Sequence, residues 1–194
     1  MRSGIETIRL RIRTLESSDE RLFRALYTDA ETMSHISEPL SDVEAKRSFE
    51  FAMRQDTHGK AASFSFAMDL KDRAEPVGIC GIRGVDLQAG TAELGMILRP
   101  YGRSQGLATE GLAALVTLAF ATFPIRTVWV QYAPEHVVAE RLVIRVGFVR
   151  CSGEGILGAC PDKRVWSIER SSWGTGHPPI SARGAQHVEH DRDS

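Results

Sequence analysis

The residues with the clearest chemical capacity form a short glycine-bearing loop, GRSQG at residues 102–106, between an expected strand and an expected long helix. The first turn of a helix has N–H groups without acceptors inside the helix, and the helix dipole is positive there. Such a loop can hold an anion with backbone groups alone. Gly106 would let a ligand approach the backbone closely because it has no side chain. We therefore predict an anion site at this loop.

The same loop matches G-x-S-x-G, which between a strand and a helix is typical of the nucleophile elbow of serine hydrolases. Asp162 and His177 follow Ser104 in the chain order Ser, Asp, His. However, Pro100 and Tyr101 separate the strand from the turn, and the preceding chain predicts antiparallel strands instead of a parallel sheet. His177 also falls in a polar segment without apolar periodicity. A serine hydrolase using Ser104 is thus a remote alternative.

Composition favours one globular domain in the cytoplasm. The 194 residues suffice for one sizeable core, and 42% hydrophobic with 25% charged residues are ordinary values. A net charge of −1 gives no electrostatic case for nucleic acid or an anionic membrane as partner. No apolar run approaches the roughly 20 residues that span a bilayer. Three scattered cysteines without CxxC spacing predict neither a metal site nor a disulfide framework, as expected in a reducing compartment.

The elements before the loop are predicted from periodicity and caps. Residues 8–13 alternate with Ile8, Leu10 and Ile12 on one face, which predicts a half-buried strand. Ser41 and Glu44 form a capping box for a helix, whose expected apolar positions are Val43, Phe49, Phe51 and Met53. A further helix is expected over about 17–30. An antiparallel meander of three strands is expected over 62–70, 77–85 and 91–99. The first of these strands should bury one face, and the glycines of the second suggest bulges.

The elements after the loop begin with an amphipathic helix that Pro124 ends. A strand is expected over 127–132, and a helix over 135–146, which Gly147 closes and which aligns Val138, Leu142 and Val146. Two final strands are expected over 148–151 and 163–170. The chain would then form one domain over residues 5–172, followed by a disordered tail over 173–194.

Arg103, Gly106 and Ala108 form an R-x-x-G-x-A pattern. It resembles the pyrophosphate-binding motif Q/R-x-x-G-x-G/A of the GNAT superfamily of N-acetyltransferases, and the order of the expected elements is similar too. The resemblance covers about residues 6–172. It is closest to the branch of ribosomal-protein alanine N-acetyltransferases (RimJ/RimL-like), through IRLRIRTLESSDERLF, AELGMIL and RSQGLATEGL.

The resemblance implies an α/β (α+β) fold with a mixed, mostly antiparallel sheet of six to seven strands and about four flanking helices, in the order β-α-α-β-β-β-α-β-α-β-β. It implies an enzyme, monomeric or homodimeric, that transfers an acetyl group from acetyl-CoA to a primary amine without a metal. The strand before the loop would splay from the next strand and pair with pantetheine. The implied cofactor-binding residues are Met96, Ile97, Leu98, Arg103, Ser104, Gln105, Gly106, Leu107, Ala108, Thr109, His136 and Arg141.

The resemblance also suggests which residues take part in acetyl transfer. Glu93 is the expected general base, although a solvated or ion-paired glutamate explains it equally well, and an N–H near Ile97 is the expected oxyanion donor. Tyr132 is a possible acid for the thiol, or a core aromatic. His136 is a possible proton carrier, or a residue that only caps the helix or contacts the cofactor. His35 falls in the connection that closes over the acceptor in relatives.

Two departures leave an alternative open. His136 and Ala139 occupy the positions where the family often has asparagine and serine, and no tyrosine follows in that helix. A non-catalytic acyl-CoA-binding module is therefore the second reading of the chain.

Overall fold

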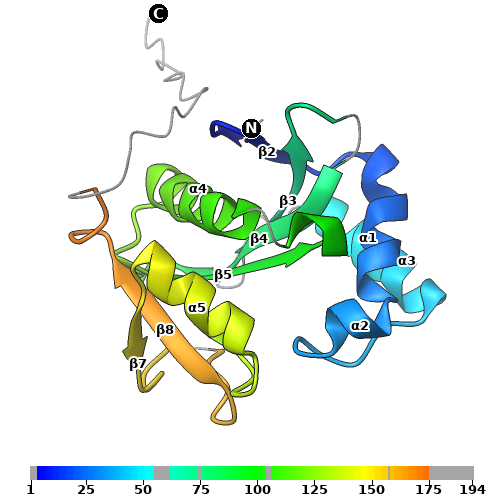
Figure 1. The fold of residues 1–194 in the computed structure, drawn as a ribbon. Helices are drawn as coiled ribbons and strands as arrows, with labels where there is room; N and C mark the ends of the chain where they lie inside the picture. The colour runs from blue at the N-terminus through cyan, green and yellow to red at the C-terminus, as the bar shows by residue number, and fades with distance from the viewer. Residues whose placement is uncertain (1–3, 55–61, 74–75, 104–105, 157, 175–194) are drawn as a thin grey trace, which may run out of the picture.

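A computed structural model describes residues 4–54, 62–73, 76–103, 106–156 and 158–174. These residues form one eight-stranded sheet, in the order β1-β2-β3-β4-β5-β6-β8-β7, with helices packed on it (Figure 1). The strands are β1 (Ile5–Glu6), β2 (Leu10–Thr14), β3 (Ala62–Leu70), β4 (Pro76–Asp86), β5 (Thr91–Leu98), β6 (Thr127–Tyr132), β7 (Val149–Cys151) and β8 (Arg164–Glu169). The helices are α1 (Glu20–Tyr27), α2 (Ala30–Met33), α3 (Asp42–Met53), α4 (Leu107–Thr122) and α5 (Val137–Val146), with 3-10 turns at Ser17–Asp19 and Pro100–Gly102. None of the described helices combines the length and the hydropathy that crossing a bilayer requires.

The predicted fold class is confirmed. Only β5 and β6 pair in parallel, and every other described strand pair is antiparallel. The sheet has eight strands instead of six to seven because the chain before β2 adds the two-residue strand β1, in which Ile5 pairs with Ile12. The expected first helix ends at Tyr27, and Asp29 then caps the separate helix α2 by accepting a hydrogen bond from the Thr32 N–H.

Helices cover both faces of the central strands (Figure 1). One core cluster joins α4 and α5 to one face of the sheet. A second cluster joins α1, α2 and α3 to the opposite face, through Leu22, Phe23, Leu26, Met33 and Phe49 on the helices and Ala67, Ile79 and Ile97 on the strands. The prediction that 62–70 buries one face is therefore wrong, since Ala67 is fully buried under the second cluster.

The other local errors have a common cause, which is that periodicity does not say where a buried face ends. Ile8 is 91% exposed because the chain turns between Thr7 and Leu10, so that the strand begins only at Leu10. Val43 and Phe51 are exposed on α3, which buries Ala45 and Phe49 instead. Val138 is likewise exposed, and the inner side of α5 is formed by Val143 and Val146.

The predicted caps are confirmed where they can be tested. Ser41 and Glu44 form the capping box that starts α3. Gly147 closes α5 in the left-handed conformation, with φ at 99°. The tail predicted over 173–194 falls, from residue 175 onward, outside the described residues.

Candidate active site

Strand β5 has two partners at its start and one at its end. It pairs with β4 as far as Leu98, but it pairs with β6 only at Thr91, Ala92 and Glu93. Beyond Glu93 the edge of β5 that faces β6 has no strand partner among the described residues. Backbone N–H and C=O groups that lack a ladder partner are available to an extended ligand. The predicted splay of these two strands is therefore present.

The ladder with β4 decides which backbone groups face this opening. The Arg99 N–H donates to the Val77 carbonyl at 2.8 Å. Hydrogen-bonded pairs alternate along an antiparallel ladder, so Ile97 also turns its N–H and C=O toward β4. Met96 and Leu98 turn theirs toward the open edge. The N–H groups that face the opening are therefore those of Met96 and Leu98, on either side of Ile97.

The side chains of these residues belong to the core. Ile97 is buried against α1 and α3, and Leu98 is buried on the opposite face of the sheet. Met96 is half-buried and packs on the same cluster as Leu98. The side chains of Ile97 and Leu98 are thus unavailable to a ligand, which leaves their backbone groups and the partly accessible Met96.

The glycine loop ends in the predicted helix start. Gly106 is the N-cap of α4, with φ at 73°, a left-handed conformation that favours glycine. The first hydrogen bond inside α4 runs from the Glu110 N–H to the Gly106 carbonyl. Helix geometry leaves the N–H groups of Leu107, Ala108 and Thr109 without acceptors inside the helix. These three groups and the left-handed glycine have the arrangement expected of the proposed anion cradle.

The first part of the loop is arranged differently from the expectation. The N–H of Gly102 donates to the Arg99 carbonyl and that of Arg103 to the Pro100 carbonyl, so neither points at a ligand. The Arg103 side chain donates to the Leu98 carbonyl at 3.2 Å and to the Thr32 hydroxyl at 2.8 Å. Arg103 therefore ties the loop to α2 in this structure. Ser104 and Gln105 lie outside the described residues.

A second arginine lies beside the cradle. An Nη atom of Arg9 is 3.6 Å from the position that a Cβ atom on Gly106 would take. Arg9 pairs with Glu110 at 2.6 Å. Burial would raise the pKa of Glu110, but hydrogen bonds from Thr7 and Arg9 outweigh it and lower that pKa. The cradle thus has a cation held beside it by the first turn of α4.

Glu93 lies where β5 and β6 separate. Its side chain is 19% exposed, and its Oε1 atom accepts a hydrogen bond from Gln131 Nε2 at 3.2 Å. Gln131 also donates to the Gly158 carbonyl at 3.1 Å and accepts from the Cys160 N–H at 2.9 Å. The loop between β7 and β8 is therefore connected to Glu93 through a single amide side chain.

Tyr132 lies at the end of β6 with its hydroxyl buried. Two buried polar side-chain atoms lack a hydrogen-bond partner in the described part of the chain, and they are Tyr132 Oη and Trp166 Nε1 on the neighbouring strands β6 and β8. Burial, reinforced by the charge of Glu140, raises the pKa of Tyr132 to about 12, and the neighbouring Trp166 side chain opposes part of this rise. Leaving a buried hydroxyl unpaired costs about 1–3 kcal/mol. Such an atom is a natural partner for a ligand that enters the opening.

The two histidines that were considered as site residues, His35 and His136, are in contact. The rings of His35 and His136 are stacked with their centroids 4.6 Å apart, and the Tyr132 ring lies edge-on to His136 at 6.3 Å. Burial, with further contributions from His35 and Arg103, lowers the pKa of His136. Its side chain makes no capping bond to α5, which excludes the capping role considered above. These effects favour the neutral form of His136, whose ring lies between those of His35 and Tyr132.

The remaining expected contacts are less informative. Leu107 is buried in the core, so only its backbone can face a ligand, whereas Ala108 and Thr109 are half-buried. Arg141 is exposed on α5.

The sequence did not reveal three further residues that lie beside predicted site residues, namely Gln131, Arg83 and Arg9. No sequence motif marks them, since their partners are distant along the chain.

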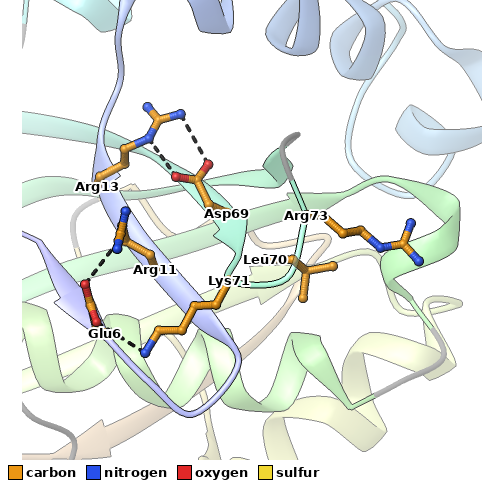
Figure 2. Close-up of a pocket in the computed structure, with 7 residues that line it drawn as sticks. All are labelled: Glu6, Arg11, Arg13, Asp69, Leu70, Lys71 and Arg73. Carbon is orange, nitrogen blue, oxygen red and sulfur yellow. Dashed lines mark hydrogen bonds and ion pairs between the residues drawn. The ribbon is translucent and has the colours of Figure 1, made fainter.

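A hollow in the described surface lies away from this site. It has a volume of about 390 Å³ and lies on β2 and β3, away from the β5–β6 opening (Figure 2). Figure 2 shows most of its charged groups bonded to one another: Arg13 to Asp69, and both Arg11 and Lys71 to Glu6. The guanidinium of Arg73 lies instead over the Tyr101 ring. Because these charges are already paired, the hollow offers no evident reaction centre.

An open strand edge that leads from a carboxylate to a helix N-terminal cradle suits a long donor with a phosphate-bearing end. The chain matches the acetyltransferase (GNAT) domain family over residues 9–149 and belongs to that family. It is an acyl-CoA N-acyltransferase, as predicted. The serine hydrolase does not fit this mostly antiparallel sheet, and both Ser104 and His177 lie outside the described residues.

Individual relatives agree with this assignment. The chain is 25% identical over 152 residues to an uncharacterised N-acetyltransferase, p20, of Bacillus licheniformis, covering 78% of this chain and 83% of that protein. The fold of the present chain is similar to that of spermidine N-acetyltransferase from Vibrio cholerae in complex with CoA and spermine. The identity is 19%, the TM-score is 0.72, and the match covers 86% of this chain and 99% of that one. The fold is also similar to that of a putative ribosomal-protein-serine acetyltransferase from Vibrio cholerae (18% identity, TM-score 0.66, 86% and 97% covered).

Proposed function

We propose that this acetyltransferase uses acetyl-CoA to acetylate a primary amine, on a small molecule or a protein N-terminus, by direct attack on the thioester. The observation that carries the proposal is the opening between β5 and β6, with Glu93 at its base and the Gly106 cradle at the far end of the same strand. This arrangement aligns the acyl end and the phosphate end of one donor along a single strand edge.

Residues of the chain fit this donor at three points. The N–H groups of Leu107, Ala108 and Thr109 would hold the pyrophosphate at the positive end of α4, next to Arg9. The backbone of Met96 and Leu98 would pair with the amide groups of pantetheine. The unpartnered Tyr132 hydroxyl would lie near the sulfur. Acetyl-CoA supplies an activated acetyl group on a good leaving group.

Glu93 is the proposed general base. As the C–N bond forms and the C–S bond breaks, the nitrogen must lose one proton and the sulfur must gain one. Gln131 occupies Glu93 Oε1, which leaves Oε2 to take the proton from the amine. The N–H of Met96 or Leu98 would stabilise the negative charge on the carbonyl oxygen.

Tyr132 is better suited to donate a hydrogen bond than a proton. Its pKa of about 12 is roughly 3.5 units above the usual value of about 8.5 for a thiol side chain. Full proton transfer to a thiolate is therefore uphill. A hydrogen bond from Tyr132 to the leaving sulfur would still stabilise developing negative charge, and water would supply the proton.

Replacement of Tyr132 by phenylalanine tests this role. The Tyr132→Phe variant should lower kcat about tenfold, as expected for loss of one hydrogen bond to a charged atom. The free protein should melt about 2–4 °C higher, since the change removes an unpaired buried hydroxyl worth about 1 kcal/mol. Steady-state kinetics and thermal unfolding without ligand measure the two effects. An unchanged kcat would exclude contact with the sulfur, and a lower melting temperature would show that the hydroxyl has a partner in solution.

The direct test of the function is release of free thiol from acetyl-CoA in the presence of a panel of amines, read with a thiol reagent. The proposal predicts release that depends on both the enzyme and an amine, together with an acetylated product of matching mass. Failure to bind acetyl-CoA at micromolar concentration would contradict it.

The departures at His136 and Ala139 support one alternative, a module that binds acyl-CoA without catalysis. Tight binding of acetyl-CoA with no turnover over a broad amine panel would favour that module. The opening between β5 and β6, with Glu93 where the two strands separate, argues for the enzyme.

The finer assignments form part of the same proposal. We assign the chain to the RimJ/RimL-like branch on the three sequence segments quoted above, with a domain over residues 5–172 that acts as a monomer or homodimer without nucleic acid. The three free thiols, Cys80, Cys151 and Cys160, fit a reducing cytoplasm.

A further inference from the structure

One arginine lies on the same side of the sheet as Glu93. Arg83 on β4 is the register partner of Glu93 on β5, and its Nη2 atom is 4.0 Å from Glu93 Oε1. A Cβ atom on Gly95 would lie 2.6 Å from the same Nη2 atom. The guanidinium therefore extends across Gly95, over the strand that leads into the opening. A residue larger than glycine at position 95 would displace it.

The Arg83 guanidinium lies near Glu93 and Tyr27. A register shift in the β4–β5 ladder follows Arg83, and bulges of this kind redirect side chains. Burial raises the pKa of Tyr27 on α1, while the positive charge of Arg83 opposes that rise, which indicates that the two side chains are close. At 4.0 Å the contact with Glu93 is longer than a hydrogen bond. Among the described residues no acceptor of a hydrogen bond from the Arg83 side chain is found.

The two side chains of this ion pair differ in their solvent exposure. The Arg83 side chain is 56% exposed, whereas that of Glu93 is 19% exposed. An acceptor whose amine reaches Glu93 would thus bring its next few atoms within reach of an accessible guanidinium. Arginine binds carboxylates through two parallel hydrogen bonds. A polyamine would instead place a second cation beside Arg83, which costs energy at this range.

We propose that Arg83 selects acceptors that carry a carboxylate close to the amine, that is, small amino acids and similar amino carboxylates. The proposal rests on the function proposed above, with Glu93 receiving the proton of the amine. Arg83 binds the carboxylate, and the amine is then directed to the opening between β5 and β6. The substrate class differs from that of the spermidine N-acetyltransferase whose fold is similar.

The experiment compares matched acceptors and matched variants. Amino carboxylates of increasing chain length, alkylamines of the same length, amino acid amides and spermidine are tested with acetyl-CoA, and kcat/KM is expressed per neutral amine. The proteins are the wild type, Arg83→Gln and Arg83→Lys. The control is Arg145→Gln, which removes the same charge from an exposed position in the last turn of α5.

The wild type should prefer a carboxylate-bearing acceptor over its uncharged counterpart by about tenfold or more, the size of one charge-assisted interaction at an accessible site. Arg83→Gln should remove the preference through a higher KM for the acceptor, without changing the KM for acetyl-CoA. Arg83→Lys should keep part of it, and Arg145→Gln all of it.

Three results would overturn the proposal: equal or better turnover of alkylamines or spermidine by the wild type, an unchanged preference in Arg83→Gln, or the same loss in Arg145→Gln. Turnover of uncharged amines alone would leave the acetyltransferase function intact and reject the role of Arg83. Absence of turnover with every amine, despite acetyl-CoA binding, would reject both.

Discussion

Gly106→Glu should abolish acetyl-CoA binding while leaving the protein folded. Gly106 has φ at 73° at the N-cap of α4, and a side chain there would point toward the space beside the Arg9 guanidinium. A glutamate would add strain of about 1–2 kcal/mol from the left-handed backbone and place a negative charge against the pyrophosphate. We expect affinity to fall by at least about a hundredfold. Isothermal titration with acetyl-CoA measures the loss.

A second glycine gives the matched control. Gly155 also has a positive φ, 76°, and has no atom within 4 Å of the position of a Cβ atom. Gly155→Glu therefore carries the same backbone strain and charge far from the cradle, and it should bind acetyl-CoA with wild-type affinity. Equal losses in the two variants would show that strain alone, and not the cradle, explains the effect. Retained affinity in Gly106→Glu would refute the assignment of the loop.

Glu93→Gln should lower kcat by about a hundredfold to a thousandfold with unchanged acetyl-CoA affinity. The glutamine has nearly the same shape and its amide oxygen can still accept the hydrogen bond from Gln131, so the loop between β7 and β8 should keep its position. What disappears is the ability to take a proton. The acidic limb of the pH–rate profile, which reports ionisation of an essential base, should disappear with it.

Glu50→Gln is a suitable control for this second prediction because Glu50 is exposed on α3. Its kinetics should match those of the wild type. If Glu93→Gln kept a normal rate and an unchanged pH profile, water would have to accept the proton, and Glu93 would be only an ion-paired residue at the entrance.

Sequence patterns predicted the parts of the fold that depend on neighbours along the chain. The capping box at Ser41 and the closing Gly147 each depend on a few adjacent residues, and the structure contains both. The exposed Ile8 and Val138 were misplaced because exposure depends on how far the neighbouring elements extend. Periodicity does not contain that information.

The features of the candidate site also differ in whether they depend on adjacent residues or on residues far apart in the sequence. The cradle lies within one loop and one helix turn, so it could be predicted from adjacent residues. The hydrogen bond from Gln131 to Glu93 joins residues 38 positions apart, and the stacking of His35 on His136 joins two different connections. Such contacts depend on the sheet order, in which β5 and β6 are neighbours only at their first residues. The contacts of Arg103 with Leu98 and Thr32 are of this kind as well.

The opening between β5 and β6 should make the stability of the protein in the cell depend on its donor. An unpaired strand edge is a template for pairing with another chain, and here it lies in the middle of the sheet. A donor bound along Met96 and Leu98 would complete the ladder, and each hundredfold excess of donor over its dissociation constant would add about 2.7 kcal/mol to the free energy of unfolding. Starvation for acetyl-CoA would then make the enzyme more prone to aggregation and proteolysis. The abundance of the protein would follow the supply of its own substrate.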